Sequence, residues 1–434
     1  MKVLLVNPNR FQKPPVIPLG LEYLFISLKE KNYEVEILDL CFCDDPLAEI
    51  QNLLNKQNYD LIGITIRNVD SVLFYNNEYF LSKIKKIVDI TKIFQIPIVL
   101  GGIGYSIAPK KILKYLKADF GIIGPGERAI VKLLEDIENR GIKNIDYKLI
   151  NGWDLGLDRD VVYKRTTNID YNQYLEEDGI VGFETQKGCK NKCSYCVEAN
   201  KRLYFKDPKN VIGEIADLVE KGYGHFHLCD SEFNQSLKHC KKFLRELIAW
   251  IKREKKERND FRWALYMVPN TYDEELFALL MKSNAYLITL SVVSDEKEQE
   301  NTSYNYQDVE KIIQYCNKYE IKIAIDLMVG FPGEKLQSIA KAIQFFRIYK
   351  PSSVGINFIF RLYECMQLTE YIFQNEIHAS KVYPEISLSS NKELDLLQPH
   401  FFRGIKLEAI EKLINKESLF KVEGLQDSVN YQRI

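Results

Sequence analysis

Histidine is scarce in this chain of 434 residues, and long apolar runs are lacking. The five histidines are His225, His227, His239, His378 and His400, so residues 1–224 contain none. Whatever chemistry the first half performs, it does without imidazole. No stretch approaches the roughly 20 uninterrupted apolar residues that a membrane helix needs. The sequence therefore predicts no membrane span.

An excess of charge of one sign is also lacking. Lys and Arg number 59 and Asp and Glu number 60, which gives a formal net charge of −1. Nucleic acid is therefore not expected as a partner. The hydrophobic fraction of 46% and the charged fraction of 27% are those of an ordinary globular enzyme and exclude a disordered chain. The length predicts two or three domains.

The N-terminus carries no pattern of a secretion signal. Met1–Val6 runs directly into a strand-like segment, without a charged flank, an apolar core and a cleavage site. We therefore expect a cytoplasmic protein, in which thiols are kept reduced. Nine cysteines in that compartment indicate metal or redox chemistry, or simple burial, before disulfides.

The first third of the chain alternates short β-branched runs with amphipathic helical patterns. This alternation predicts βαβ units and a doubly wound parallel sheet. Ligands of such folds bind beyond the carboxyl ends of the strands. The expected strands are Lys2–Asn7, Glu34–Leu38, Leu61–Ile66, Pro97–Leu100 and Phe120–Ile123. The expected helices lie near Leu19–Lys31, Leu47–Lys56, Leu81–Phe94, Lys110–Leu116 and Arg128–Arg140.

The alternation stops at about residue 143 and resumes at 181. We expect a domain at 1–142, a linker at 143–180, a second domain at 181–368 and a C-terminal cap at 369–434. Six βα units in the second domain indicate an open barrel. Residues after about 370 show helix and loop but no clear strand. The expected barrel strands are Val181–Thr185, His225–Cys229, Arg262–Val268, Tyr286–Val292, Ile321–Met328 and Val354–Phe360.

Three cysteines follow the first expected barrel strand within eight residues. They are Cys189, Cys193 and Cys196, in a Cys-x3-Cys-x2-Cys pattern. Thiolates are soft ligands that suit iron–sulfur clusters or zinc. A structural zinc site normally has four ligands, and Cys229, His225 or His227 would have to supply the fourth. A four-iron cluster on three thiolates instead leaves one iron open to a substrate or cofactor.

This pattern, with the aromatic Tyr195 before the last cysteine and after the first strand of a six-unit barrel, resembles the radical S-adenosylmethionine (SAM) superfamily. The resemblance implies a [4Fe-4S] cluster on Cys189, Cys193 and Cys196. It implies that the open iron binds SAM, whose reductive cleavage yields a 5′-deoxyadenosyl radical. It also implies a low-potential electron donor such as flavodoxin or ferredoxin.

Further segments resemble the SAM-contacting elements of that superfamily. The segment Asp230–Asn234 is similar to the one that contacts the SAM amino group, with Glu232 as the acceptor; its alternative interpretation is a surface turn that caps a helix. The segment Asp326–Glu334 is similar to the glycine-proline turn beside the adenine. The cofactor-binding residues implied by the resemblance are Tyr195, Asp230, Glu232, Ser291, Ser294, Gly330 and Pro332.

The first domain resembles the cobalamin (B12)-binding domain that precedes the barrel in a large radical SAM subclass. The resemblance rests on Pro18–Leu24, on Gly101 and Gly102, and on Gly124–Glu127. It implies cobalamin contacts at Gly101, Gly102, Gly126 and Glu127. Arg67 faces the corrin in one interpretation and forms a salt bridge with Asp70 in another. Without a histidine, the domain supplies no imidazole to cobalt, and a fold without corrin is a third interpretation.

Together the resemblances imply an α/β protein: an N-terminal doubly wound Rossmann-like sheet, a partial (β/α)6 radical SAM barrel and a short, mostly helical C-terminal segment. The implied function is cobalamin-dependent methyl transfer to an unactivated carbon of a small-molecule substrate. A radical SAM lyase, dehydratase or isomerase is the alternative, followed by a non-catalytic iron–sulfur or zinc module. Cys365, after the last barrel strand, is a candidate hydrogen donor, with plain packing as its alternative.

Overall fold

The computed structural model describes residues 1–158, 161–165, 168–384 and 396–425. The chain divides into two compact units. Unit 1 consists of Met1–Ser71, Glu78–Gly182 and Tyr204–Lys221, and unit 2 consists of Val72–Asn77, Phe183–Leu203 and Gly222–Ile434. No helix of the described residues has the length and apolar character to cross a membrane.

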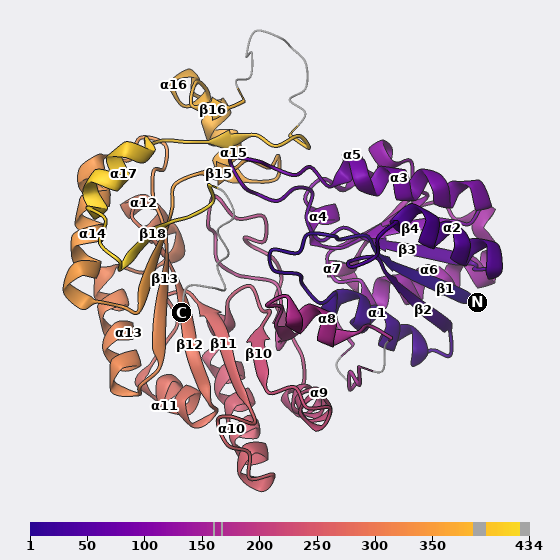
Figure 1. Ribbon diagram of the computed structural model, residues 1–434, viewed down its shortest axis with the longest axis horizontal. Helices are drawn as coiled ribbons and strands as arrows, with labels where there is room; N and C mark the ends of the chain where they lie inside the picture. The colour runs from indigo at the N-terminus through magenta and orange to yellow at the C-terminus, as the bar shows by residue number, and fades with distance from the viewer. Residues whose placement is uncertain (159–160, 166–167, 385–395, 426–434) are drawn as a thin grey trace. The chain divides into compact units, whose positions relative to one another are not determined.

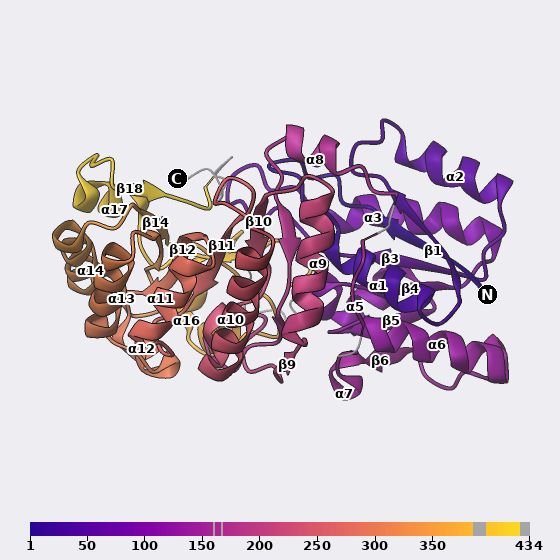
Figure 2. The ribbon, with the colours of Figure 1, turned by 90° about the horizontal axis from the view of Figure 1, so that it is seen from below.

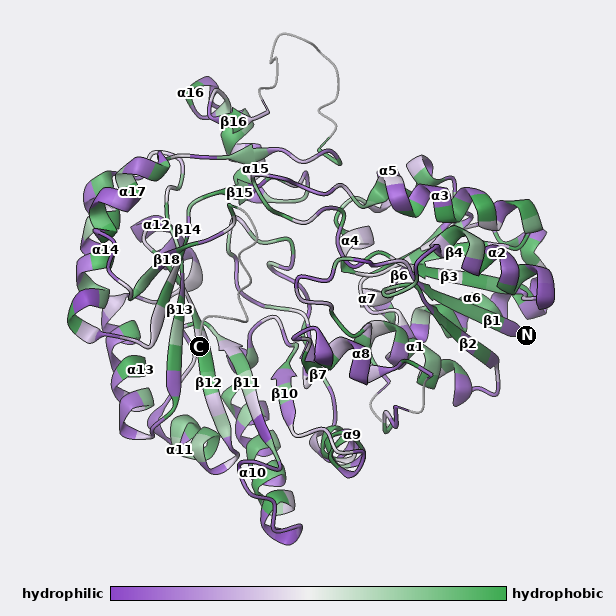
Figure 3. Cartoon of the chain, viewed as in Figure 1, coloured by the Kyte–Doolittle hydropathy of each residue, from purple (hydrophilic) through white to green (hydrophobic). Residues whose placement is uncertain are grey.

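Unit 1 is built on a parallel sheet with the strand order β2-β1-β3-β4-β5-β6 (Figure 1). Its strands are β1 (Lys2–Asn7), β2 (Glu34–Asp39), β3 (Leu61–Thr65), β4 (Ile98–Gly101), β5 (Phe120–Ile123) and β6 (Leu149–Asn151). The central strands β1, β3 and β4 are mostly hydrophobic (Figure 3), as expected for parallel strands that helices cover on both faces. The doubly wound sheet predicted from the sequence is confirmed.

The helices of unit 1 follow its strands in alternation. They are α1 (Leu19–Lys29), α2 (Pro46–Lys56), α3 (Leu81–Thr91) with the 3-10 turn η1 (Lys92–Phe94), α4 (Ile103–Ser106), α5 (Pro109–Leu116) and α6 (Glu127–Arg140) with η2 (Ile142–Asn144). The segment expected as a linker differs from the prediction, because β6 within it pairs with β5 as a sixth strand. That segment also forms α7 (Gly152–Leu155) and α8 (Tyr171–Glu176).

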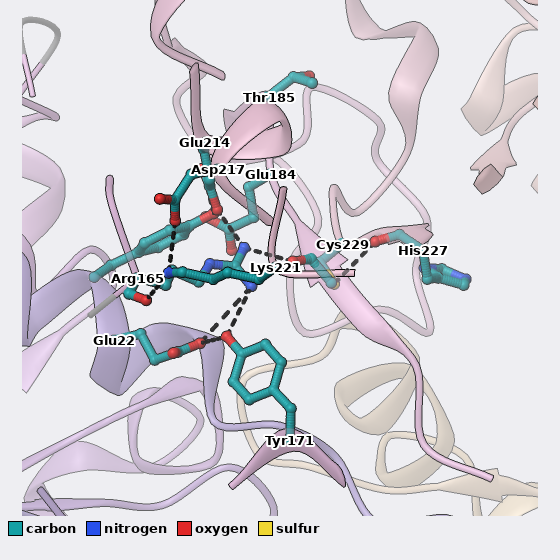
Figure 4. Close-up of polar contacts among 12 residues, drawn as sticks. Glu22, Arg165, Tyr171, Glu184, Thr185, Glu214, Asp217, Lys221, His227 and Cys229 are labelled. Carbon is teal, nitrogen blue, oxygen red and sulfur yellow. Dashed lines mark hydrogen bonds and ion pairs between the residues drawn. The ribbon is translucent and has the colours of Figure 1, made fainter. Parts of the chain in front are cut away.

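Unit 1 also contains β9 (Tyr204–Phe205) and α9 (Pro208–Glu220), which the sequence assigns to the barrel. The physical reason is a buried polar cluster around Arg165 (Figure 4). Arg165 Nη2 pairs with Glu214 of α9, and Arg165 Nη1 lies 3.7 Å from Glu22 of α1. Tyr171 donates a hydrogen bond of 2.6 Å to Glu22. Because buried charges need partners, these contacts fix α9 in unit 1.

Unit 2 contains a sheet with the strand order β18-β14-β13-β12-β11-β10-β7. The strands from β10 to β18 pair in parallel. They are β10 (His225–Leu228), β11 (Arg262–Met267), β12 (Ala285–Val293), β13 (Lys322–Met328), β14 (Ser353–Asn357) and β18 (Phe420–Val422). Edge strand β7 (Val181–Phe183) begins in the last residues of unit 1, and β8 (Gln186–Lys187) follows it. The partial barrel predicted from the sequence is confirmed.

Helices lie along one face of this sheet (Figure 2). They are α10 (Leu237–Arg253) after the 3-10 turn η3 (Phe233–Gln235), α11 (Glu274–Lys282), α12 (Glu296–Thr302), α13 (Tyr306–Lys318), α14 (Leu336–Tyr349) and α17 (Leu407–Ile414). A small antiparallel sheet has the order β15-β17-β16, with strands Phe360–Arg361, Phe401–Phe402 and Val382–Tyr383. The helices α15 (Gln367–Phe373) and α16 (Glu376–Ala379) stand beside it.

The C-terminal segment therefore differs from the expected helix and loop. Its strands β16, β17 and β18 are only two or three residues long, too short for a periodic pattern to indicate them. The six residues Val72–Asn77 also belong to unit 2, although the sequence places them in the first domain. The Phe74 amide donates to the Gly424 carbonyl (2.9 Å), and the Phe74 ring lies 5.6 Å from that of Phe401.

Candidate active site

The three cysteines of the motif lie on one loop of unit 2. Gly188 begins this loop with φ +90°, and a Cβ at this position would lie 2.1 Å from the Arg202 carbonyl oxygen. The loop closes on itself, because the Lys201 amide donates to the Cys189 carbonyl (2.8 Å). Glycine is the residue that allows both the positive φ and the close approach. The local fold thereby gathers the cysteines on one compact loop.

Cys189 is buried, Cys193 and Cys196 are half-buried, and the three thiols influence one another. Burial raises the pKa of Cys189 to about 12 and that of Cys196 to about 11, with a contribution from the nearby Glu232 carboxylate. Burial also raises the pKa of Cys193, to which the other two thiols contribute. Such thiols ionise when an electropositive group binds them, and that binding releases protons.

The number of thiols on the loop bears on the group that they could bind. Thiolates that share one zinc ion each lie about 2.3 Å from it. Among the described residues, no three His, Cys, Asp or Glu side chains converge closely enough to hold a single ion. Cys229, His225 and His227 therefore do not complete a zinc site with the motif. A four-iron cluster binds each thiolate through a different iron, so three thiols on one loop suit it.

Glu232 and Ser291 form a polar pair at the carboxyl ends of β10 and β12. Ser291 Oγ donates a hydrogen bond of 2.8 Å to Glu232 Oε1. Burial raises the pKa of Glu232 to about 8, and the charge of Asp326 contributes to the rise. The Glu232 carboxylate lies close enough to all three cysteines to raise the pKa of each. Contact of Glu232 or Ser291 with SAM stays a prediction.

Asp230 fixes the segment that leads into the cysteine loop. Its Oδ1 accepts from the Thr185 amide (2.8 Å) and the Gln186 amide (3.1 Å), and its Oδ2 accepts from Thr185 Oγ1. Burial raises the pKa of Asp230 to about 7, although these three hydrogen bonds act in the opposite direction. In this structure the carboxylate serves the protein's own backbone, and its contact with a cofactor stays a prediction.

The glycine-proline turn after β13 is held by Glu334. Glu334 Oε2 accepts from the Gly330 amide (2.7 Å) and the Phe331 amide (3.1 Å). Ser294 Oγ donates to Glu334 Oε1, and Ser294 is only 1% exposed. Ser294, expected beside a ribose, thus contacts Glu334, which supports the turn that contains Gly330 and Pro332. Its contact with SAM stays a prediction.

Tyr195 and Cys365 occupy different surroundings. The Tyr195 ring packs against Phe331 (5.6 Å between centroids) and Phe360 (6.2 Å), which joins the cysteine loop to the glycine-proline turn. Cys365 is exposed after β15. Burial of its sulfur raises the pKa of Cys365, and the positive charge of Lys201 on the cysteine loop opposes this rise. The role of Cys365 as a hydrogen donor stays a prediction.

The structure adds residues that the sequence did not single out. Gln235 Oε1 accepts from the Lys190 amide (2.9 Å), Asn270 Nδ2 donates to Asn191 Oδ1 (2.9 Å), and Glu298 Oε2 accepts from the Ser194 amide (3.3 Å). These pairs are 45, 79 and 104 residues apart in sequence. No local motif relates partners so distant, and only the folded chain shows that the three side chains support the cysteine loop.

In unit 1, Arg67 lines a cavity at the carboxyl ends of β1 and β3. The cavity has a volume of about 150 Å³. The contact of Arg67 with a corrin and its salt bridge with Asp70 both stay predictions. The residues around the cavity include Asn9, Arg10, Thr65, Phe80 and Lys83.

Glycines at the same edge leave room for a bulky ligand. A Cβ at Gly101 would meet no atom within 4 Å, whereas one at Gly102, with φ +98°, would lie 2.6 Å from the Ile66 carbonyl oxygen. Tyr105 follows them, fully buried, and its hydroxyl has no hydrogen-bond partner among the described residues. The Tyr105 hydroxyl packs against Gly121 of β5, so the open backbone at Gly101 is the feature of this edge that fits a bulky cofactor such as cobalamin.

Gly126 is the N-cap of α6, and Glu127 is its first residue. A Cβ at Gly126 would lie 2.9 Å from the Leu24 side chain, so this glycine permits the contact between α6 and α1. Glu127 is 3% exposed. The structure therefore places both residues in helix packing, and their contact with cobalamin stays a prediction.

Comparison with known protein families gives two matches. The model of the radical SAM superfamily matches residues 183–346, and that of the B12 binding domain matches residues 13–134. This chain contains a radical SAM domain and a B12-binding domain. The first match spans the cysteine loop and the glycine-proline turn, and the second spans the edge with Arg67 and Gly101.

Curated relatives of this chain include methyltransferases. The tryptophan 2-C-methyltransferase of Streptomyces laurentii is 24% identical, and the alignment covers 85% of this chain and 74% of the relative. An uncharacterized methyltransferase of Pyrococcus horikoshii is 23% identical over 80% of this chain and 77% of its own length.

Solved structures share the fold of both units. The radical SAM methyltransferase TsrM from Kitasatospora setae, with cobalamin and a [4Fe-4S] cluster bound, has a TM-score of 0.84 at 23% identity, covering 97% of this chain and 93% of its own. The cobalamin-dependent SAM radical enzyme OxsB has a TM-score of 0.72 at 14% identity, covering 93% of this chain and 64% of its own. These likenesses show that both units have the fold of the corresponding parts of those structures.

Proposed function

We propose that this enzyme methylates carbon in a small-molecule substrate, with SAM as the methyl source and cobalamin as the methyl carrier. The observation that supports this function best is the presence of two cofactor sites of different chemistry in one chain. Unit 2 presents three cysteines on a compact loop, and unit 1 presents an open glycine edge beside Arg67. The similarity to methyltransferases over most of the chain supports the same activity.

The residues of unit 2 would hold the cluster and SAM. Cys189, Cys193 and Cys196 would supply the three thiolates, and Glu232 would accept from the ammonium group of SAM. Ser291 orients Glu232, and Glu334 shapes the turn on which the adenine would rest. Asp230 holds the start of the cysteine loop. When bound, the cluster supplies an electron for cleavage of SAM, and cobalamin supplies a carrier for the methyl group.

The residues of unit 1 would hold cobalamin. The backbone at Gly101 can approach a bulky ligand. Arg67 would lie beside the corrin, where its positive charge disfavours a second cation and its donors suit amide groups. Because residues 1–224 contain no histidine, no imidazole of this unit would bind cobalt.

L-Tryptophan is the first substrate to test, since one solved TsrM structure contains it as substrate. The experiment uses protein purified from cobalamin-fed cells and reconstituted with iron and sulfide without oxygen. With SAM, a reductant and L-tryptophan, we expect S-adenosylhomocysteine and a methylated product by mass spectrometry. A flavodoxin or ferredoxin would replace the chemical reductant in a second assay.

The products distinguish the proposal from its alternative. Formation of 5′-deoxyadenosine without S-adenosylhomocysteine, for any substrate of a panel of small molecules, would indicate a lyase, dehydratase or isomerase. Purified protein without corrin absorbance would contradict the role given to unit 1. A Cys193→Ala variant that still forms either SAM product would contradict the role given to the cluster.

A further inference from the structure

Glu298 reaches the cysteine loop from helix α12. Its Oε2 accepts from the amide of Ser194 at 3.3 Å, and Ser194 is joined directly to Cys193. The Ser194 carbonyl accepts in turn from the Leu368 amide (2.9 Å). Both sides of this peptide are thus held by hydrogen bonds. A glutamate from another element is bonded to the backbone between two expected cluster ligands.

The same helix holds the first half of the cysteine loop through Asn270. Asn270 Nδ2 donates to Asn191 Oδ1 (2.9 Å) and to the carbonyl of Thr302 (2.8 Å), the last residue of α12. Thr302 Oγ1 donates to the Glu298 carbonyl (2.9 Å). The two ends of α12 are therefore connected to the loop on either side of Cys193. These hydrogen bonds hold the loop residues between the cysteines, and none of them involves a cysteine sulfur.

The carboxylate of Glu298 has no compensating cation. Glu298 is 9% exposed, and its remaining side-chain hydrogen bond comes from Asn301 Nδ2 (3.4 Å). No Lys, Arg or His among the described residues pairs with it. The charge of an ionised carboxylate is poorly screened at such a site. The Ser194 amide is also directed to Glu298, so it is not available for a hydrogen bond to a cluster sulfur.

Both features bear on the reduction of a cluster held at Cys193. Negative charge nearby opposes the addition of an electron, and hydrogen bonds to the sulfurs favour it. We propose that Glu298 is a positioning residue that holds the cysteine loop and lowers the reduction potential of its cluster. This inference rests on the cluster of the proposed function. The inference goes beyond that function by naming a residue that influences how low the potential of the electron donor must be.

The test measures the midpoint potential of the reconstituted cluster by EPR-monitored redox titration. Glu298→Gln keeps the size of the side chain and an oxygen that accepts from Ser194, but it removes the charge. We expect the equilibrium constant for cluster reduction to rise about tenfold, which corresponds to about 59 mV for one electron. Glu296→Gln, on an exposed position of the same helix, is the matched control and should leave the potential unchanged.

A second variant separates the charge from the support of the loop. Glu298→Ala should raise the potential like Glu298→Gln and should also lose iron faster to a chelator, because the Ser194 amide loses its acceptor. A purely structural role would appear as faster iron loss in Glu298→Ala with no change of potential in Glu298→Gln. That result, or an equal shift in Glu296→Gln, would overturn the inference. A wild-type protein that assembles no cluster would instead contradict the proposed function as well.

Discussion

Arg165 and Glu214 form an ion pair in the interior of unit 1, and each side chain is only 1% exposed. The arginine comes from the segment after the first domain, and the glutamate comes from α9. Tyr23 donates a further hydrogen bond of 3.0 Å to Glu214. Because an unpaired charge is costly in an apolar interior, this pair keeps α9 in unit 1 although its sequence neighbours belong to unit 2.

Removing the negative partner should destabilise the protein. We expect Glu214→Gln to lower the free energy of unfolding by about 3 kcal/mol, since Arg165 then stays buried without its nearest counter-charge. Asp217→Asn, on the same helix, removes a partly exposed pair with Lys221 and should cost less than about 1 kcal/mol. Urea denaturation followed by circular dichroism measures both. Equal losses of unfolding free energy in the two variants would show that the buried pair stabilises the protein no more than the partly exposed pair does.

Removing one cysteine should abolish cluster assembly. In Cys193→Ala, we expect iron content and the broad visible absorbance after anaerobic reconstitution to fall close to zero, because two thiolates remain on the loop. Cys43→Ser, which changes a half-buried thiol of unit 1, is the control and should retain the cluster. A cluster of normal content in Cys193→Ala would contradict the assignment of the motif.

Loss of the Glu334 carboxylate should weaken SAM binding. Without it, the amides of Gly330 and Phe331 lose their acceptor and the turn loosens. A penalty of about 1.4 kcal/mol corresponds to about tenfold weaker binding of SAM to Glu334→Ala. Equilibrium dialysis with the reconstituted protein measures this affinity, and Glu408→Ala, at an exposed position of α17, is the control. Unchanged affinity in Glu334→Ala would mean that the turn does not contact SAM.

Asp230 should make stability depend on pH. Its pKa is raised from the ordinary 3.8 to about 7 in the fold, mainly by burial. The protonated acid therefore contributes stability that is fully present below the ordinary pKa and is lost as the pH rises through about 7. Asp230→Asn stays neutral, and its amide can keep the contacts to Thr185 and Gln186. We expect this variant to gain stability relative to wild type between about pH 5 and pH 8.

Thermal unfolding of the apo-protein across this pH range measures the difference. Asp44→Asn changes an exposed aspartate of unit 1 and should follow the wild type at every pH. A constant difference between Asp230→Asn and wild type would show that Asp230 does not titrate in this range.

The alternation of strands and helices could be predicted because it depends on neighbours in sequence. Apolar runs such as Lys2–Asn7 and amphipathic stretches such as Glu127–Arg140 carry their own periodic signal. The segment Leu149–Asn151, expected in a linker, is too short to carry such a signal. It becomes a strand by pairing with β5, which its own sequence does not indicate. The cysteine motif and the glycine-proline turn were visible as local spacings. The other proposed cofactor contacts stay predictions.

By itself, the sequence determined that three thiols share one short loop, that the chain contains two α/β units and that no histidine serves the first unit. These are properties of composition and short-range spacing. The tertiary structure alone decided that α9 joins unit 1, that Ser294 supports Glu334 and that Glu298 faces the peptide after Cys193. Each of these depends on polar side chains from distant segments, which must find partners when they leave water. The partner that each finds is set by the packing of the whole chain.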